Sequence, residues 1–415
     1  MRNIVRNAKS LISGSLWANL ITVISAPILT RLYLPEHFGT FGIFATFVAL
    51  VFPLLTLRYT LAIPVPKSDS HALSLVKLSF VSAGLLLALL TALLSTPFLS
   101  AVLPESHGVI LQYNALFIIA IAFFSTYEIL GSWAIRNRHI NTLTVTTVTK
   151  AFWSATSKIL LGLSGIVSTG LLLGHVIQGA AGNVPLAKKF FQDMLHESAS
   201  PRKPPILAIA KRYRQFPIYR LPSQALAIFC TKSPILFMAA IYDKSIAGQF
   251  TLALMLVSLP VETLSKNASK AFYAEIAGKN KPHSSEIARL YTNVALRLSI
   301  IAIAPAVAIG VIAPFIVPII FGSNWDTAGM YVGWLTVGAY MMFVFSHTSH
   351  TLTIIEKNRI YLIHRAIQAA TLLALFIFAF EMKLGPLNTV IALSVITAAH
   401  YATLGIYVFL KVRNA

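Results

Sequence analysis

The sequence predicts an all-α polytopic membrane protein with about twelve transmembrane helices. Of its 415 residues, 56% are hydrophobic and only 11% are charged, whereas about a quarter of the residues in an ordinary soluble domain are charged. The hydrophobic residues form long blocks, and a single soluble core does not grow much beyond about 250–300 residues. Lys and Arg gather between alternate blocks. These observations indicate a chain folded in lipid, and they exclude a soluble or disordered one.

Twelve blocks are long and apolar enough to span the membrane, because about 20 apolar residues in a helix cross the hydrocarbon layer. We expect them near residues 11–31, 39–60, 76–100, 110–132, 143–163, 166–187, 217–240, 247–265, 290–312, 328–352, 362–380 and 387–410. The connections predicted on the outer side are short, for example 34–38, 104–108 and 322–329. They leave no room for a catalytic domain on that side.

The basic residues predict the orientation. The connections at 1–10, 58–77, 133–150, 188–214, 263–289, 356–365 and 411–415 hold 26 of the 33 Lys and Arg residues, and the opposite connections hold almost none. The positive-inside rule then puts both termini in the cytoplasm. The formal net charge of +20 is explained by orientation and by attraction to anionic lipid headgroups. No nucleic acid is expected as a partner.

A short internal repeat predicts two related halves. Ser25-Ala26-Pro27-Ile28-Leu29 precedes Tyr33, Gly39 and Phe41, and Ser233-Pro234-Ile235-Leu236 precedes Tyr242, Gly248 and Phe250. The two copies lie six spans apart, and six is even, so both halves share one orientation. We predict a six-helix lobe at 1–187, a basic cytoplasmic connector at 188–214 and a second six-helix lobe at 215–415. The start of the connector, 186–195, is either a surface amphipathic helix or a solvated linker.

The same residues carry a family resemblance. The stretch from Ser25 to Tyr33, the segment Pro35-Glu36-His37-Phe38-Gly39 and the stretch Leu57 to Pro64 resemble the first helices of bacterial Wzx-type oligosaccharide flippases. In the second half, Tyr242-Asp243, Ala247-Gly248-Gln249-Phe250, Leu259-Pro260 and Phe272-Tyr273-Ala274-Glu275 agree. That family belongs to the multidrug/oligosaccharidyl-lipid/polysaccharide (MOP) exporter superfamily. The resemblance implies a MATE/MOP-like fold, with two pseudo-symmetric six-helix lobes around a central cavity.

The resemblance also implies a substrate and a location. Such a flippase moves an undecaprenyl-diphosphate-linked oligosaccharide, an O-antigen or capsule repeat unit, from the cytoplasmic to the periplasmic leaflet by alternating access. The expected location is the bacterial inner membrane, with the lipid bilayer and other polysaccharide-assembly membrane proteins as partners. Many relatives carry a basic residue where this chain has Met255, which puts one phosphate contact in doubt.

Ionisable residues at membrane depth are costly and are therefore candidates for function. A diphosphate needs several N–H donors, and Arg can bind phosphate in bidentate fashion. Snorkelling of the long side chains to the headgroups is the competing interpretation, most of all for Arg58, Lys158 and Arg220. For Arg31 the family match is the stronger argument, because helical phase turns it away from the polar stripe of its block. The candidates for a cationic cavity are Arg31, Arg58, Lys158, Arg220, Lys232 and Arg297.

Few residues suggest ion coupling or metal binding. Glu128 is the carboxylate deepest in the first lobe, and it is either a proton carrier or the ion-pair partner of a nearby Arg or Lys. His347 and His350 lie one turn apart, which is too few ligands for a metal site, and Cys230 is the single cysteine. We therefore expect no cofactor and no metal, and we leave H⁺ or Na⁺ open as the coupling ion.

Two other functions compete with the flippase. An ion-coupled multidrug antiporter of the same fold, acting on organic cations, predicts buried acids where this sequence has mainly Arg and Lys. A membrane-embedded glycan polymerase is disfavoured by the short outer connections. We expect a transporter and not an enzyme, and we find no nucleotide-binding motif that would supply ATP.

Overall fold

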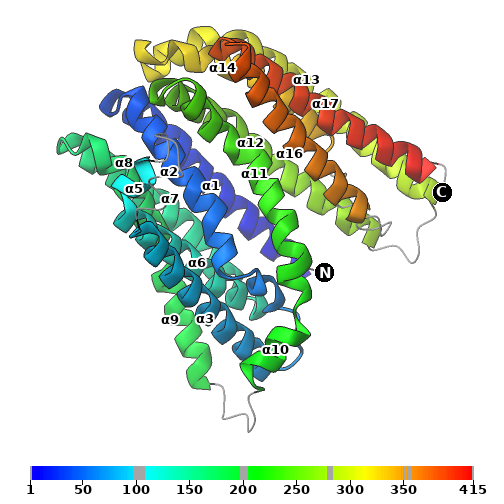
Figure 1. The fold of residues 1–415 in the computed structure, drawn as a ribbon. Coiled ribbons are helices and arrows are strands. Elements are labelled where there is room, and N and C mark those ends of the chain that lie inside the picture. Colours follow the sequence, from blue (N-terminus) through cyan, green and yellow to red (C-terminus); the bar gives the residue numbers. More distant parts are fainter. Residues whose placement is uncertain are drawn as a thin grey trace. The chain divides into compact units, whose positions relative to one another are not determined.

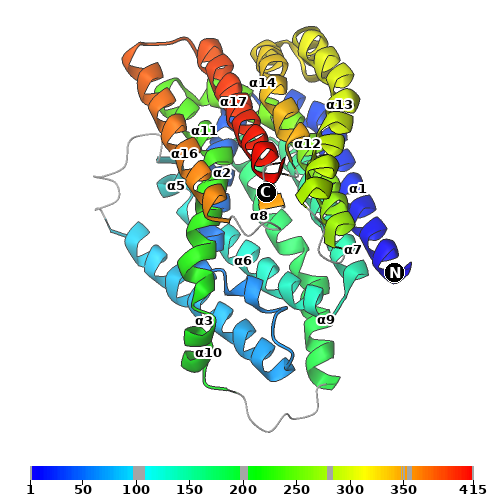
Figure 2. The ribbon, with the colours of Figure 1, turned by 90° about the vertical axis from the view of Figure 1, so that its right-hand side faces the viewer.

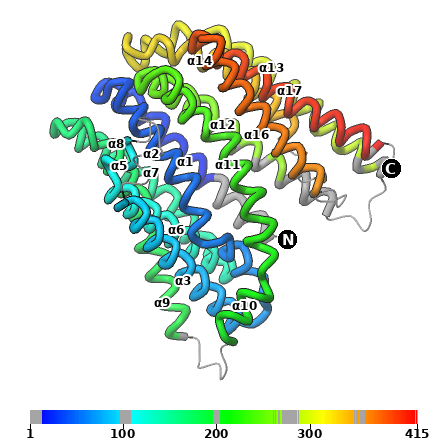
Figure 3. The backbone as a smooth tube through the Cα atoms, in the orientation of Figure 1, coloured from blue at the N-terminus to red at the C-terminus, as the bar shows by residue number. Residues whose placement is uncertain are grey.

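The computed structural model describes residues 2–96, 108–196, 204–277, 284–346, 348, 351–352 and 358–413 (Figure 3). Every regular element in these ranges is a helix (Figure 1). The chain forms two compact units. Unit 1 holds Met1–Tyr33 and Gly39–Ala240, and unit 2 holds Leu34–Phe38 and Ile241–Ala415. Five residues early in the chain thus belong to the unit that the C-terminal part builds.

Most helices of unit 1 are long and apolar. They are α1 (Arg2–Leu32), α2 (Pro35–Leu55, whose first turn belongs to unit 2), the 3-10 turn η1 (Tyr59–Ala62), α3 (Asp69–Leu94), α5 (Gly108–Gln112), α6 (Asn114–Arg136), α7 (Ile140–Leu163), α8 (Val167–Ala181), α9 (Asn183–His196), α10 (Ile206–Arg212), the π turn η3 (Phe216–Arg220) and α11 (Leu221–Ile241). Within this unit α1 packs on α7, and α6 and α7 both contact α8.

Unit 2 is built around α14. Its helices are α12 (Lys244–Ala277), α13 (Ser284–Phe321), the 3-10 turn η4 (Ser323–Trp325), α14 (Asp326–Val344), α16 (Asn358–Glu381) and α17 (Pro386–Arg413). α14 packs against α12, α13 and α17 (Figure 2). Glycines let α13 and α14 approach closely, because an added Cβ at Gly329 would lie 2.9 Å from the main-chain oxygen of Ala313, and one at Gly333 would lie 2.8 Å from that of Gly310. Small residues are the usual means of close helix packing in lipid.

Gln249, within the second copy of the predicted repeat, ties α12 to the start of α14. Its Nε2 donates to the main-chain oxygen of Asn324 at 2.6 Å, and its Oε1 accepts from the Ala328 N–H at 2.9 Å. The next residue, Phe250, meets Tyr331 of α14 edge to face at 6.2 Å between ring centres. The motif residues of this half therefore hold the first helix pair of unit 2 in place.

Nine helical segments in the described ranges are long and apolar enough to cross a membrane: Ser13–Leu32, Pro35–Leu55, Asp69–Leu94, Asn114–Arg136, Phe216–Ile241, Ala288–Phe321, Ser323–Val344, Arg359–Glu381 and Pro386–Lys411. Each of the twelve predicted blocks falls largely on a helix. Three of the predicted blocks are not among these nine segments. They lie on α7, which is rich in Thr and Lys, on α8, which is short, and on α12, whose apolar part Lys244–Leu259 is also short. The all-helical membrane fold is confirmed, and the exact count of twelve spans stays a prediction.

The predicted sixth span is broken near its end. α8 stops at Ala181 and α9 begins at Asn183, whose Nδ2 donates to the main-chain oxygens of Phe123 and Gly179, both at 3.1 Å. The start of the predicted connector is therefore helical. α9 has one apolar edge exposed, with Val184, Phe191 and Leu195 at 72%, 64% and 86%, and its opposite side packs on α6 through Leu186 and Phe190.

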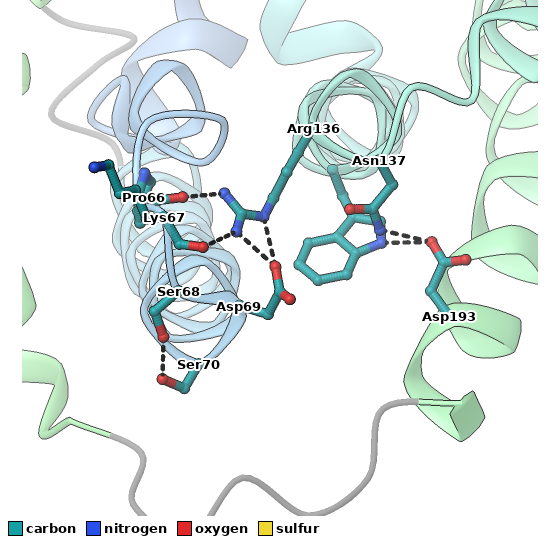
Figure 4. Close-up of polar contacts among 9 residues, drawn as sticks. Pro66, Lys67, Ser68, Asp69, Ser70, Arg136, Asn137 and Asp193 are labelled. Carbon is teal, nitrogen blue, oxygen red and sulfur yellow. Dashed lines mark hydrogen bonds and ion pairs between the residues drawn. The ribbon is translucent and has the colours of Figure 1, made fainter.

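The C-terminal end of α6 joins α3 and α9 through two acidic residues (Figure 4). Arg136 pairs with Asp69 at 2.6 Å and also donates to the main-chain oxygens of Pro66 and Lys67. On the other side, Asp193 of α9 accepts from Trp133 Nε1 at 2.9 Å and Asn137 Nδ2 at 2.8 Å, and pairs with His139 Nε2 at 2.8 Å. Burial alone would raise the pKa of Asp193, but the hydrogen bonds from Asn137, His139 and Trp133 outweigh it and hold that pKa below its usual value.

Candidate functional site

A buried ion pair joins the end of α2 to the middle of α6. Arg58 Nη1 contacts Glu128 Oε1, and Thr56 Oγ1 donates to Glu128 Oε2 at 3.4 Å. The two charged side chains are only 6% and 17% exposed. Of the two hypotheses for Glu128, proton carrier or ion-pair partner, the geometry favours ion pairing, and the basic residue is Arg58.

The backbone around Arg58 is strained. Leu57 and Arg58 both adopt the left-handed region, with φ of 46° and 57°, at a cost of roughly 1–2 kcal/mol per residue for L-amino acids. Two such residues in succession reverse the chain between α2 and η1, and this reversal directs the Arg58 side chain toward α6. Strain of this kind persists where the surrounding contacts over-determine it, and it concentrates at functional sites.

Lys158 lies inside unit 1. Its Nζ sits 4.4 Å from the centre of the Phe41 ring, and its stem runs against Gly174 of α8. Its main-chain oxygen accepts a 2.7 Å hydrogen bond from the Tyr33 hydroxyl at the end of α1. The side chain of Lys158, one of the predicted site cations, thus packs between α2 and α8.

A second lysine on α7, Lys150, falls where the predicted connection 133–150 and the predicted span 143–163 overlap. The structure places it ten residues into the helix, or about 15 Å along its axis. Its Nζ is 3.5 Å from the centre of Tyr127 and 5.1 Å from that of Phe124. The signal that could have located it is its spacing of eight residues from Lys158, which returns to nearly the same face of a helix.

His175 of α8 lies among the same aromatic rings. Its ring centre is 4.9 Å from Phe124, 5.6 Å from Phe41 and 6.2 Å from Phe44. Its Nδ1 is 2.9 Å from Gln178 Oε1. Three basic residues, Lys150, Lys158 and His175, therefore share one aromatic environment in the interior of unit 1.

The remaining predicted cations do not join these groups. Arg31 in the last turn of α1, Arg220 at the end of η3 and Arg297 of α13 are exposed, and Lys232 of α11 is half-buried. Met255 is half-buried on α12. Of the predicted site residues, Arg58 and Glu128 contact each other.

Within the described residues, no group of three or more His, Cys, Asp or Glu side chains could hold a metal ion. His347 and His350 lie outside those residues. Cys230 is buried in α11.

The fold is that of a class of polytopic, all-helical membrane proteins. The chain has the fold of an inward-facing multidrug resistance MATE family transporter of the MOP superfamily, with a TM-score of 0.72, 13% identity and 98% of both chains covered. It also shares the fold of the lipid II flippase MurJ in its inward closed conformation, with a TM-score of 0.71, 15% identity, and 97% of this chain and 89% of that chain covered.

The sequence itself gives the family. Residues 28–329 match the polysaccharide biosynthesis protein family, and the chain belongs to that family. No curated protein matches it. The predicted polysaccharide family and the predicted MATE/MOP-like fold are thereby confirmed.

Proposed function

We propose that this protein is a flippase that moves an undecaprenyl-diphosphate-linked oligosaccharide from the cytoplasmic to the periplasmic leaflet of the bacterial inner membrane. The oligosaccharide is an O-antigen or capsule repeat unit, transport proceeds by alternating access, and both termini lie in the cytoplasm. Membership of the polysaccharide biosynthesis family and a fold shared with a lipid II flippase support this proposal. Other membrane proteins of polysaccharide assembly supply the substrate and consume the product.

The observation that carries the proposal is the balance of charge at membrane depth. In the described part of unit 1, Glu128 lies deep in a spanning helix, and Arg58 already neutralises it. A carrier of organic cations needs carboxylates that can accept its substrate, so the pairing of Glu128 argues against the multidrug alternative. A surplus of Lys and Arg instead suits a diphosphate and an anionic glycan.

The proposal assigns different roles to the predicted cations. Arg31, Arg220, Lys232 and Arg297 line the path of the diphosphate, because their side chains are exposed or half-buried. Arg58 instead holds Glu128, and Lys158 packs on Phe41 within unit 1. Arg is the better phosphate ligand of the two residue types, since its planar fork can donate two parallel hydrogen bonds.

The test measures on which leaflet the lipid-linked glycan lies. Spheroplasts with and without the protein are treated with an impermeant sugar-labelling reagent. We expect the glycan lipid to accumulate unlabelled when the protein is missing. Lys232→Ala, Arg297→Ala and Arg31→Ala should reduce labelling, and Lys211→Ala, which removes the same charge from the exposed surface of α10, should not. Unchanged labelling together with increased sensitivity to cationic drugs would establish the antiporter instead.

A further inference from the structure

Two half-buried lysines of unit 1, Lys150 and Lys158, lie against aromatic rings. Among the described residues no carboxylate forms an ion pair with either of them. Their ammonium groups lie against Tyr127, Phe124 and Phe41. A cation–π contact offsets only part of the cost of taking a charge out of water. The neutral form of each lysine is therefore easier to reach here than in water.

His175 connects the two lysines. Phe124 touches both Lys150 and His175, and Phe41 touches both Lys158 and His175. Both lysines act electrostatically on the imidazole. Because Gln178 Oε1 is the partner of Nδ1, Nδ1 carries the ring proton and Nε2 holds the lone pair that accepts another.

The glycines of α8 make room for these side chains. A Cβ at Gly174 would lie 2.3 Å from Lys158 Cγ, and a Cβ at Gly182 would lie 2.7 Å from Lys150 Cδ. A Cβ at Gly179 would lie 3.1 Å from two atoms of the Phe124 ring. The close packing of α7 on α8 thus requires glycine where each lysine stem passes, so the lysine positions are specified by the fold.

The groups that face this cluster are few and mostly neutral. α1 contributes the Tyr33 hydroxyl, which is bonded to the Lys158 main chain, and α2 contributes Phe41 and Phe44. α6 contributes Phe124 and Tyr127, whose hydroxyl is bonded to Thr146. Three like charges in a region of low dielectric repel one another strongly, so protonation of one basic group opposes protonation of the others.

We propose that Lys150, Lys158 and His175 form a proton-binding site inside unit 1, and that H⁺ exchange at this site is coupled to transport. A neutral lysine Nζ or His175 Nε2 accepts a proton from a hydronium ion, so that one O–H bond breaks as the N–H bond forms. In the reverse step the N–H bond breaks and the proton returns to water. The coupling rests on the proposed function, whereas the proton-binding site itself does not. Glu128, for which the sequence left a proton-carrier role open beside ion pairing, is paired with Arg58.

The first experiment tests the site without substrate. Histidine-selective ¹⁵N NMR of the purified full-length protein in detergent follows the ring nitrogens of His175 from pH 5 to 10, with His175→Gln assigning the signal. We expect the ring signals to shift as the neighbouring lysines lose their protons, and the midpoint of this shift to move in Lys158→Met and Lys150→Met but not in Lys188→Met, which removes a lysine from the exposed surface of α9. A signal that does not titrate, or a midpoint that neither lysine variant moves, overturns the site.

The second experiment tests the coupling. The full chain is reconstituted in liposomes with fluorescent undecaprenyl-diphosphate-linked N-acetylglucosamine as the probe, and the flipping rate is measured with and without a pH difference. We expect the ratio of the two rates to exceed one in the wild type and in Lys188→Met, and to fall to one in His175→Gln, Lys150→Met and Lys158→Met. A ratio that persists in all three variants overturns the coupling. A wild-type protein that moves no probe at all counts against the proposed function, while the NMR titration still decides the site.

Discussion

Tyr33 and Tyr242 make equivalent hydrogen bonds in their own units. Tyr33, after α1, donates to the main-chain oxygen of Lys158 at 2.7 Å. Tyr242, after α11, donates to the main-chain oxygen of Leu384 at 2.9 Å, and its hydroxyl lies 2.5 Å from Thr389 Oγ1. Each tyrosine thus bonds a main-chain oxygen far along the chain within its own unit, in α7 for Tyr33 and between α16 and α17 for Tyr242. This is the arrangement that a duplicated six-helix unit would produce, and the two residues are the ones that the short sequence repeat aligns.

Removing either hydroxyl should destabilise the protein modestly. Tyr33→Phe and Tyr242→Phe each lose hydrogen bonds to partly buried acceptors, and we expect a loss of about 0.5–1.5 kcal/mol in the free energy of unfolding for each. Thermal unfolding in detergent measures this. Tyr219→Phe is the matched control, because Tyr219 is 69% exposed. Equal melting temperatures for all three variants would mean that the two bonds contribute nothing to stability.

Breaking the Arg58–Glu128 pair should cost far more than breaking a surface pair. Glu128→Gln leaves the guanidinium buried without its counter-charge, and such truncations cost about 3–5 kcal/mol. In Asp69→Asn the loss should stay below about 1 kcal/mol, since Asp69 is 59% exposed and its pair with Arg136 is screened by water. Denaturation of the purified variants compares the two.

The double variant Arg58→Met/Glu128→Met separates a structural role from a role in transport. Replacing both charges by apolar groups should restore much of the stability lost in Glu128→Gln. If the double variant is stable and still exports glycan, the pair is structural. If it is stable and inactive, one of the two residues takes part in transport.

The contact of α9 with α6 should weaken in acid. The carboxyl of Asp193 has a lower pKa in the folded protein than in the unfolded chain. The pKa of an unperturbed Asp is about 3.9. Its stabilising contribution is therefore present above that unfolded value and is lost as the pH falls through the folded value. Between pH 5 and 3 the melting temperature of the wild type should fall more steeply than that of Asp193→Asn. Parallel curves would show that Asp193 does not contribute.

Two glycine substitutions should have effects of opposite sign. Gly333→Ala places a Cβ 2.8 Å from the Gly310 main-chain oxygen, which cannot move aside, so we expect a loss of about 1–3 kcal/mol. Gly84→Ala in α3 meets nothing within 4 Å and should stabilise its helix by roughly 0.5–1 kcal/mol. Melting temperatures that shift in the same direction would contradict the close packing of α13 on α14.

The all-helical membrane fold could be predicted from the sequence, because the length and hydropathy of an apolar block indicate directly whether it lies in lipid. The sequence left the boundaries between spans and connections ambiguous where polar residues begin a helix. Lys150 and Arg365 fall both in a predicted span and in a predicted basic connection. The structure places Lys150 within α7 and Arg365 within α16, where Arg365 donates to Tyr361 and Gln368. The mean hydropathy of a stretch of sequence is low both for a solvated loop and for a helical turn rich in Thr or bearing Arg, so it does not distinguish them.

Pairwise chemistry was the harder part to predict. The sequence could say that Glu128 needs a basic partner, but the choice of Arg58, 70 residues away, depends on the left-handed turn at Leu57 and Arg58. Neither residue is a glycine, the residue type that usually marks a left-handed turn, so the turn could not be predicted from the sequence. The cluster of Lys150, Lys158 and His175 likewise depends on how α2, α6, α7 and α8 pack on one another.

The assignment of Leu34–Phe38 to unit 2 has a consequence for biosynthesis. Phe38 packs edge to face on the fully buried Trp325 at 4.8 Å between ring centres. The ribosome releases Phe38 nearly three hundred residues before Trp325. Unit 2 is therefore completed only when Trp325, made late in synthesis, packs on Phe38, made early. The segment Leu34–Phe38 has to stay accessible until Trp325 has been synthesised.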